Sequence, residues 1–133
     1  MSAISVFKAY NRNYVDYLGD VAKPEKGTAK IARLIGPPNS SSIGGGVVVY
    51  ERATVDWDLP FDEMITVIEG AMRIHSSGAS YDLGPGDVAW FPSHTPLTYQ
   101  VPERVVVSYA IYPLQQAQPS EVLKPSLQSK LRG

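Results

Sequence analysis

The residue of this sequence best suited to acid–base chemistry is Glu63, which begins an alternating segment, residues 63–69. In a β-strand, Glu63, Ile65, Val67 and Glu69 lie on one face and the residues between them lie on the other. If that face looks into an apolar interior, desolvation raises the pKa of Glu63, and a carboxyl group poised nearer neutrality acts as a general acid or base. Tyr99 is two residues from Leu97 in another predicted strand, so it lies on the same face as Leu97 and is the candidate hydroxyl partner.

A glutamate and a tyrosine that act without a metal suit proton transfer next to a carbonyl group, as in an isomerase or a lyase. The structural alternative is a buried glutamate that only holds the fold through hydrogen bonds to tyrosine and backbone groups. The eight tyrosines are themselves expected from strand propensity in an all-β protein. Both roles of Glu63 therefore stay open.

The sequence offers few of the other groups that catalyse reactions or bind metals. It has no cysteine, which excludes disulfides, thiolate metal sites and a cysteine nucleophile. His75 and His94 fall at predicted turns or strand ends, and two imidazoles are too few for a tight transition-metal site, so we expect no metal ligands. Residues 44–46 are glycines, but Val47 follows them, without the lysine and hydroxyl residue of a phosphate-binding loop.

Length and composition indicate one globular domain. The 133 residues are 44% hydrophobic and 19% charged, far from the composition of disordered chains. Twelve basic residues stand against 13 acidic ones, so no net field draws the chain to nucleic acid or an anionic membrane. Residues 1–17 contain neither a signal-peptide core nor a run long enough to span a membrane, and we expect a cytoplasmic location.

Short apolar stretches punctuated by glycine and proline predict many short strands. The predicted strands are residues 30–35, 47–52, 63–69, 71–75, 80–83, 87–91, 97–101 and 104–112. Their number suits a barrel or sandwich, and the run 39–46 is predicted to be a mobile loop. Three segments follow: a lead-in with edge strands and this loop over 1–43, a core over 44–113, and a tail over 114–133.

Two spacings resemble the two motifs of the cupin family. Glu63 and Gly70 match E-x6-G, and Gly86 and Pro92 match G-x5-P in the expected order. The resemblance implies a single-domain, all-β double-stranded β-helix, a jelly-roll-like barrel. Most cupins hold a metal with three histidines and a glutamate; here the histidine positions are occupied by residues 56–59 and by Leu97, so a metal-independent cupin is expected.

A closer resemblance is to the cupin domain of the ethanolamine-utilisation protein EutQ, a family that also lacks the histidine set. The segments that carry it are Tyr50-Glu51, 57–63, 67–70, 86–88, Phe91-Pro92 and 109–113. The resemblance implies a role in ethanolamine breakdown, association with bacterial microcompartments and an acetate kinase activity with ATP and Mg²⁺. Under that kinase hypothesis Arg73, Arg52 or Lys30 would supply charge, and Glu63 with Glu69 or Asp62 would bind Mg²⁺.

Cupin substrates lie among the inner strands, and this resemblance supplies the remaining site residues. The predicted catalytic set is Glu63, Tyr99 and Tyr50. The predicted substrate-binding set is Glu51, Trp57, Tyr109 and Arg73. Trp57 is also a candidate for simply closing one end of the barrel.

The leading hypothesis is a EutQ-like cupin that binds a small organic molecule in its barrel. The alternatives are a metal-independent lyase or isomerase that uses Glu63 and tyrosines, and a non-catalytic ligand-binding or assembly module. Cupins commonly pair by exchanging N-terminal strands, so the apolar stretch 4–10 predicts a homodimer.

Overall fold

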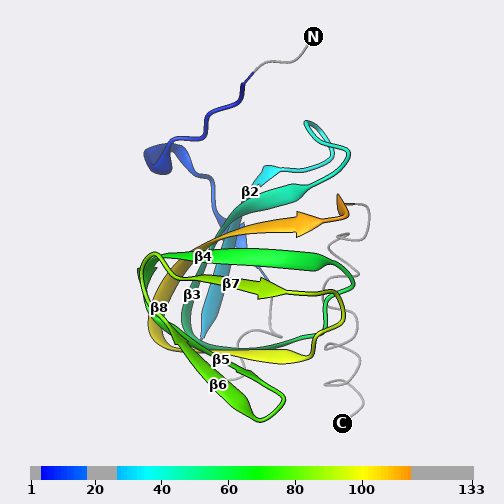
Figure 1. Ribbon diagram of the computed structural model, residues 1–133. Coiled ribbons are helices and arrows are strands. Elements are labelled where there is room, and N and C mark those ends of the chain that lie inside the picture. Colours follow the sequence, from blue (N-terminus) through cyan, green and yellow to red (C-terminus); the bar gives the residue numbers. More distant parts are fainter. Residues whose placement is uncertain (1–3, 18–26, 115–133) are drawn as a thin grey trace.

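The computed structural model describes residues 4–17 and 27–114, and these form an almost entirely β structure (Figure 1). The elements in chain order are η1 (Ala9–Asn11), β1 (Val15–Asp16), β2 (Thr28–Ile35), β3 (Gly44–Trp57), β4 (Asp62–Gly70), β5 (Met72–Ser76), β6 (Ala79–Leu83), β7 (Val88–Phe91) and β8 (Leu97–Tyr112). The all-β fold class predicted from the sequence is confirmed. Apart from Leu114, the predicted tail lies outside the described residues.

The strands form one sheet that curls around an interior. Its order is β1-β2-β3-β8-β4-β7, and the hairpin of β5 and β6 joins it through β8. All of these pairings are antiparallel, and β3 and β8 run side by side over almost their whole length. Figure 1 shows these two long strands bending round the barrel, so that they contribute to both of its walls. The predicted core, 44–113, begins with β3 and ends just after β8.

The predicted strands 97–101 and 104–112 are one continuous strand, β8. Val101 pairs with Ala53 and Arg104 with Glu51, and the register shifts between these two pairs. Arg52 takes a positive φ of 47° in this bulge. Pro102 lies in the same irregular stretch, where its missing N–H removes no hydrogen bond from the ladder. Pro102, which separates the two predicted strands, therefore marks a bend within one continuous strand.

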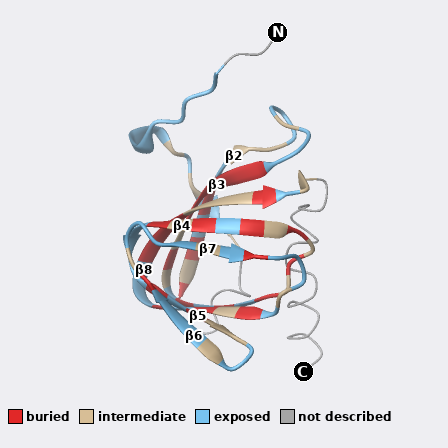
Figure 2. Ribbon diagram, in the orientation of Figure 1, coloured by how far each residue is buried: buried red, intermediate tan, exposed pale blue. Residues whose placement is uncertain are grey.

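Buried positions recur along the strands of the barrel (Figure 2), and the residues at these positions are almost all apolar. Val107 of β8 pairs with Val48 of β3 on one side and with Val67 of β4 on the other, and all three are buried. Burying such a side chain fully contributes about 1.5–3 kcal/mol. Because these buried residues pair with one another across neighbouring strands, the alternation that predicted the strands also determines which side chains face the centre of the barrel.

The N-terminal part of the chain lies beside the barrel and adds only a short strand to it. β1 pairs with β2, and the Tyr17 N–H donates to the carbonyl of Ala29 at 2.9 Å. Residues 4–10, the predicted exchanging strand, form no strand within this chain, and Ile4 and Tyr10 are almost fully exposed. Among the described residues, no helix is long and apolar enough to cross a membrane.

Candidate functional site

The barrel encloses a cavity of about 50 Å³, measured as the space open to the centres of water molecules. A single water fills roughly 10–15 Å³, and the 50 Å³ counts only the positions that its centre can take, so the cavity holds several waters or a small organic group. Six aromatic rings line it: Tyr17, Tyr50, Trp57, Phe61, Tyr99 and Tyr109. Among the described lining residues, the charged or ionisable side chains besides the tyrosines are Glu63 and Arg33.

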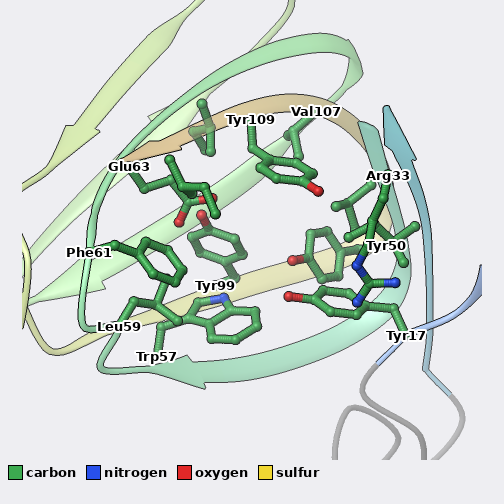
Figure 3. Close-up of a pocket in the computed structure, with 14 residues that line it drawn as sticks. Tyr17, Arg33, Tyr50, Trp57, Leu59, Phe61, Glu63, Tyr99, Val107 and Tyr109 are labelled. Atoms are coloured by element: carbon green, nitrogen blue, oxygen red, sulfur yellow. The ribbon is translucent and has the colours of Figure 1, made fainter. Parts of the chain in front are cut away.

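Glu63 lies on β4 and points into this cavity (Figure 3). It pairs with Phe91 on β7 and Ile111 on β8, which are both buried, so the inner face of three strands surrounds its carboxyl group. Its Oε1 atom is buried and has no hydrogen-bond partner. Burial raises the pKa of Glu63 from 4.5 to about 8. At neutral pH the group is therefore mostly a neutral carboxylic acid, which both donates and accepts a hydrogen bond.

Tyr50 and Tyr99 lie next to each other on the wall of the cavity. Tyr50 comes from β3 and Tyr99 from β8, and their rings meet edge to face with centroids 5.6 Å apart. Burial raises the pKa of both phenols well above 10, and nearby Glu63 raises it further. Figure 3 shows their hydroxyl groups directed into the cavity, with that of Tyr99 toward Glu63. Both tyrosines are thus neutral hydroxyl donors and acceptors.

Trp57 ends β3 and presents its indole edge to the same cavity. Its ring packs edge to face on Tyr99 with centroids 6.2 Å apart. The indole Nε1 is buried and has no hydrogen-bond partner. An indole N–H can only donate, and leaving it buried and unpaired costs about 1–3 kcal/mol. The wall of the cavity therefore carries a donor that a water molecule or a ligand in the cavity can satisfy.

Arg33, Tyr17 and Tyr109 form the rim of the cavity. The Arg33 guanidinium lies 5.5 Å from the centroid of the Tyr17 ring, which is a cation–π contact. Burial raises the pKa of Tyr109 to about 12, and the nearby Arg33 acts against this rise. Positive charge therefore stands at the rim, while the interior around Glu63 is neutral at pH 7.

The structure does not bring two of the predicted substrate-binding residues to the cavity. Arg73, on β5, forms an exposed ion pair with Asp82 at 2.6 Å. Glu51, on β3, accepts a hydrogen bond from the Thr28 hydroxyl and lies 3.6 Å from the Arg104 guanidinium. Both lie outside the lining of the cavity, whereas Glu63, Tyr99, Tyr50, Trp57 and Tyr109 all belong to it.

Glu69 does not share the face of Glu63, contrary to the prediction from alternation. The register of β4 on β8 shifts between Val67 and Glu69, and this bulge turns Glu69 outward to Arg104, at 3.2 Å. Asp62 accepts a hydrogen bond from the Ser93 backbone N–H at 2.8 Å. The three carboxylates proposed for Mg²⁺ thus point to different places and do not form the shared oxygen-ligand set that the ion requires.

No group of three or more histidine, cysteine, aspartate or glutamate residues able to hold a metal ion occurs within residues 4–17 and 27–114. The arrangement that these residues do form is a small site of neutral donors with one cation at its rim. These residues do not fit a site for ATP–Mg²⁺.

Three lining residues that bear on the site are not predicted from the sequence: Tyr17, Arg33 and Phe61. Tyr17 and Arg33 fall in the predicted lead-in. They reach the rim only because β1 pairs with β2 and β2 pairs with β3. Phe61 belongs to the segment 57–63 that carried the family resemblance, and its place between Leu59 and Glu63 was the available signal.

Comparison with known families and curated proteins gives a consistent match. The model of the family "Ethanolamine utilisation protein EutQ" matches residues 4–118. "Acetate kinase EutQ" of Clostridioides difficile (strain 630) is 28% identical over 74 residues, which are 56% of this chain and 47% of that protein. The protein of the same name from Salmonella typhimurium is 26% identical over 80 residues, 60% of this chain and 35% of that protein. This chain thus spans less than half the length of these relatives.

Solved structures show the same barrel. The Clostridium difficile EutQ protein superposes with a TM-score of 0.69 at 26% identity, covering 77% of this chain and 73% of that one. The polyketide cyclase RemF from Streptomyces resistomycificus superposes with a TM-score of 0.70 at 14% identity, covering 83% and 80% of the two chains. The second likeness shows the fold alone. Together they confirm the predicted cupin barrel.

Proposed function

Because the chain belongs to the family of the ethanolamine utilisation protein EutQ, we propose that its barrel binds a small organic acid or carbonyl compound formed in ethanolamine breakdown. Glu63 would donate a proton or a hydrogen bond to an oxygen atom of that compound. The cavity of about 50 Å³ sets its size: the part held inside the barrel has only a few heavy atoms.

The observation that carries this proposal is the pair of buried polar atoms without partners, Glu63 Oε1 and Trp57 Nε1, which line one cavity. The indole N–H must donate, and a protonated carboxyl group also has a proton to donate. A carbonyl or carboxylate oxygen accepts from both. An ammonium group cannot pair with the indole N–H, and Arg33 at the rim disfavours a cation. The donor set therefore favours an oxygen acceptor over an amine.

Proton transfer is the chemistry that this arrangement supports. When a carbonyl oxygen accepts the Glu63 proton, the carbonyl carbon becomes more electrophilic, and a carboxyl group with a pKa of about 8 exchanges that proton readily near neutral pH. Tyr99 lies beside Glu63 and supplies a neutral hydroxyl that orients the same oxygen. This favours a metal-independent isomerase or lyase as the enzymatic form of the proposal. If the protein binds this compound without converting it, the barrel serves instead as a sensor or an assembly module.

Acetate kinase activity is the second candidate, because the curated relatives carry that name at 26–28% identity. Acetate is a small oxygen acceptor that fits the donors of the cavity. The phosphoryl donor is a separate requirement, since the acidic residues considered for Mg²⁺ do not converge. The two candidates therefore share the acid-binding step and differ in whether ATP takes part.

The test is titration calorimetry with acetate, acetaldehyde and ethanolammonium, at about pH 6.5, 7.5 and 9. We expect acetate to bind and ethanolammonium not to bind. Acetate affinity should fall about tenfold for each pH unit above 8, because it requires the protonated form of Glu63. Binding of ethanolammonium that strengthens as the pH rises would overturn the assignment.

Activity assays on the same protein separate the candidates. Formation of acetyl phosphate from acetate and ATP–Mg²⁺, lost in Glu63→Gln, would support the kinase. Exchange of solvent deuterium into a bound carbonyl compound without ATP would support proton transfer. Binding without either reaction would leave the ligand-binding module.

We also propose that the chain forms a homodimer and, as its family implies, that it associates with a bacterial microcompartment. The exposed apolar side chains of Ile4, Val6 and Tyr10 lie outside the barrel of their own chain, which supports a contact with a second copy. Light scattering tests the dimer, and the triple change of these residues to serine should shift the mass to that of a monomer.

A further inference from the structure

We propose that the ligand is longer than acetate, with its oxygen-bearing end in the barrel cavity and an aliphatic chain in a second compartment outside it. The inference rests on the proposed function, because it takes the acid or carbonyl group as the buried end. The second compartment is a hollow of about 440 Å³ where β2 ends and the chain turns toward β3, here called the outer hollow.

The outer hollow adjoins the cavity. Arg33, Tyr109 and Ile111 line both spaces, so the same three side chains form the boundary between them. Tyr109 is half-buried, and its pKa is affected by both Arg33 and Glu63, which places its phenol between the rim and the interior. A ligand that passes Tyr109 enters one space from the other.

Gly46 provides the room for this boundary. It pairs with Tyr109 across β3 and β8, and a Cβ atom at this position would lie 3.1 Å from the Tyr109 hydroxyl and in contact with the carbonyl oxygen of Ala32. Because Gly46 has no side chain, the ring of Tyr109 can lie across the strand at the mouth of the cavity. The boundary is thus a single aromatic side chain next to a glycine.

The lining of the outer hollow is mostly apolar. Leu34, Ile35, Pro37 and Leu114 supply hydrocarbon surface. The Asn39 side chain is already satisfied, since its Oδ1 accepts from the Gly36 N–H and its Nδ2 donates to the Leu34 carbonyl.

The charged side chain on the wall of the outer hollow, among the residues that the structure describes, is Arg33 at the boundary. The cavity offers neutral donors, the boundary a cation and the outer hollow a hydrocarbon surface. An aliphatic acid matches this arrangement, because its carboxylate needs the donors and the cation and its chain needs the apolar surface. Its carboxylate would lie between Glu63 and Arg33 and its chain beyond Tyr109.

The test is the affinity of the full-length protein for a series of linear acids: acetate, butanoate, hexanoate and octanoate. Burial of each methylene contributes ~0.8 kcal/mol, which corresponds to about a fourfold gain in affinity. Because the outer hollow is partly open to solvent, we expect a two- to fourfold gain for each methylene. Ile35→Ser should flatten this series and leave acetate affinity unchanged, because the side chain of Ile35 lines the outer hollow and not the cavity.

The control is Ile68→Ser, which makes the same chemical change on an exposed position of β4 outside both spaces. It should leave the whole series unchanged. Leu34→Ser replaces Ile35→Ser if the latter unfolds. Acetate binding with no gain from acetate to octanoate would overturn the second compartment and leave the proposed function standing. Absence of binding by every acid would remove both.

Discussion

Replacing Glu63 with glutamine should stabilise the protein near neutral pH. Burial raises the pKa of this carboxyl group to about 8 in the folded chain, whereas its ordinary value in the unfolded chain is 4.5. Between these two values the folded state keeps a proton that the unfolded state releases. Stability contributed by this group is therefore present at acid pH and is lost as the pH rises toward 8. Glutamine has no proton to lose, so the variant lacks this loss.

The size of the effect follows from the two pKa values, 4.5 and about 8. Each pH unit between them lowers the free energy of unfolding of the wild type by ~1.4 kcal/mol. From about pH 5 to 7.5 the wild type should lose roughly 3 kcal/mol relative to Glu63→Gln. For a chain of this size, that difference corresponds to roughly 10 °C in melting temperature.

The assay is urea unfolding of both proteins, without added ligand, at about pH 5, 6, 7 and 7.5. The control is Glu103→Gln, the same change at an exposed glutamate, which should show no pH-dependent gain. Parallel pH profiles for Glu63→Gln and the wild type would refute the reasoning. Such a result would mean that water, an ion or a rearranged donor stabilises the carboxylate of Glu63 in the folded state.

Three further outcomes are expected. Trp57→Phe removes an unpartnered buried N–H but also buried ring volume, so the two effects should largely offset and change the stability of the unliganded protein by no more than about 1 kcal/mol, while acetate binding weakens roughly tenfold in calorimetry. Gly46→Ala should cost about 1–3 kcal/mol in thermal unfolding, because its Cβ would meet the Ala32 carbonyl, whereas Gly84→Ala, with open space around it, should cost far less. Arg33→Gln should weaken acetate binding and reduce its salt dependence, while Arg73→Gln, outside the cavity, should change neither.

The sequence by itself determined the strands and the motif turns. Period-two alternation needs no distant contacts, so it predicted an all-β fold and the inward face of Glu63. Gly70 and Gly86 adopt positive φ angles of 78° and 90°, and this local requirement explains why the two motifs could be identified from spacing alone. The position of Tyr99 two residues from Leu97 also predicted its place at the site, whereas Tyr50, Tyr109 and Trp57 were predicted from the resemblance to the cupin family.

The tertiary structure decided what else reaches the cavity. Alternating residues share one face of a strand only as far as the next bulge. The bulge after Val67 therefore turns Glu69 outward. Arg33 and Tyr17 come to the rim because the consecutive strands β1 and β2 extend the sheet beyond β3, and strand pairing is a contact that alternation within one strand does not predict. Whether a buried donor has a partner also depends on every surrounding strand at once. The unpaired N–H of Trp57, on which the proposed ligand class depends, was therefore visible only in the folded barrel.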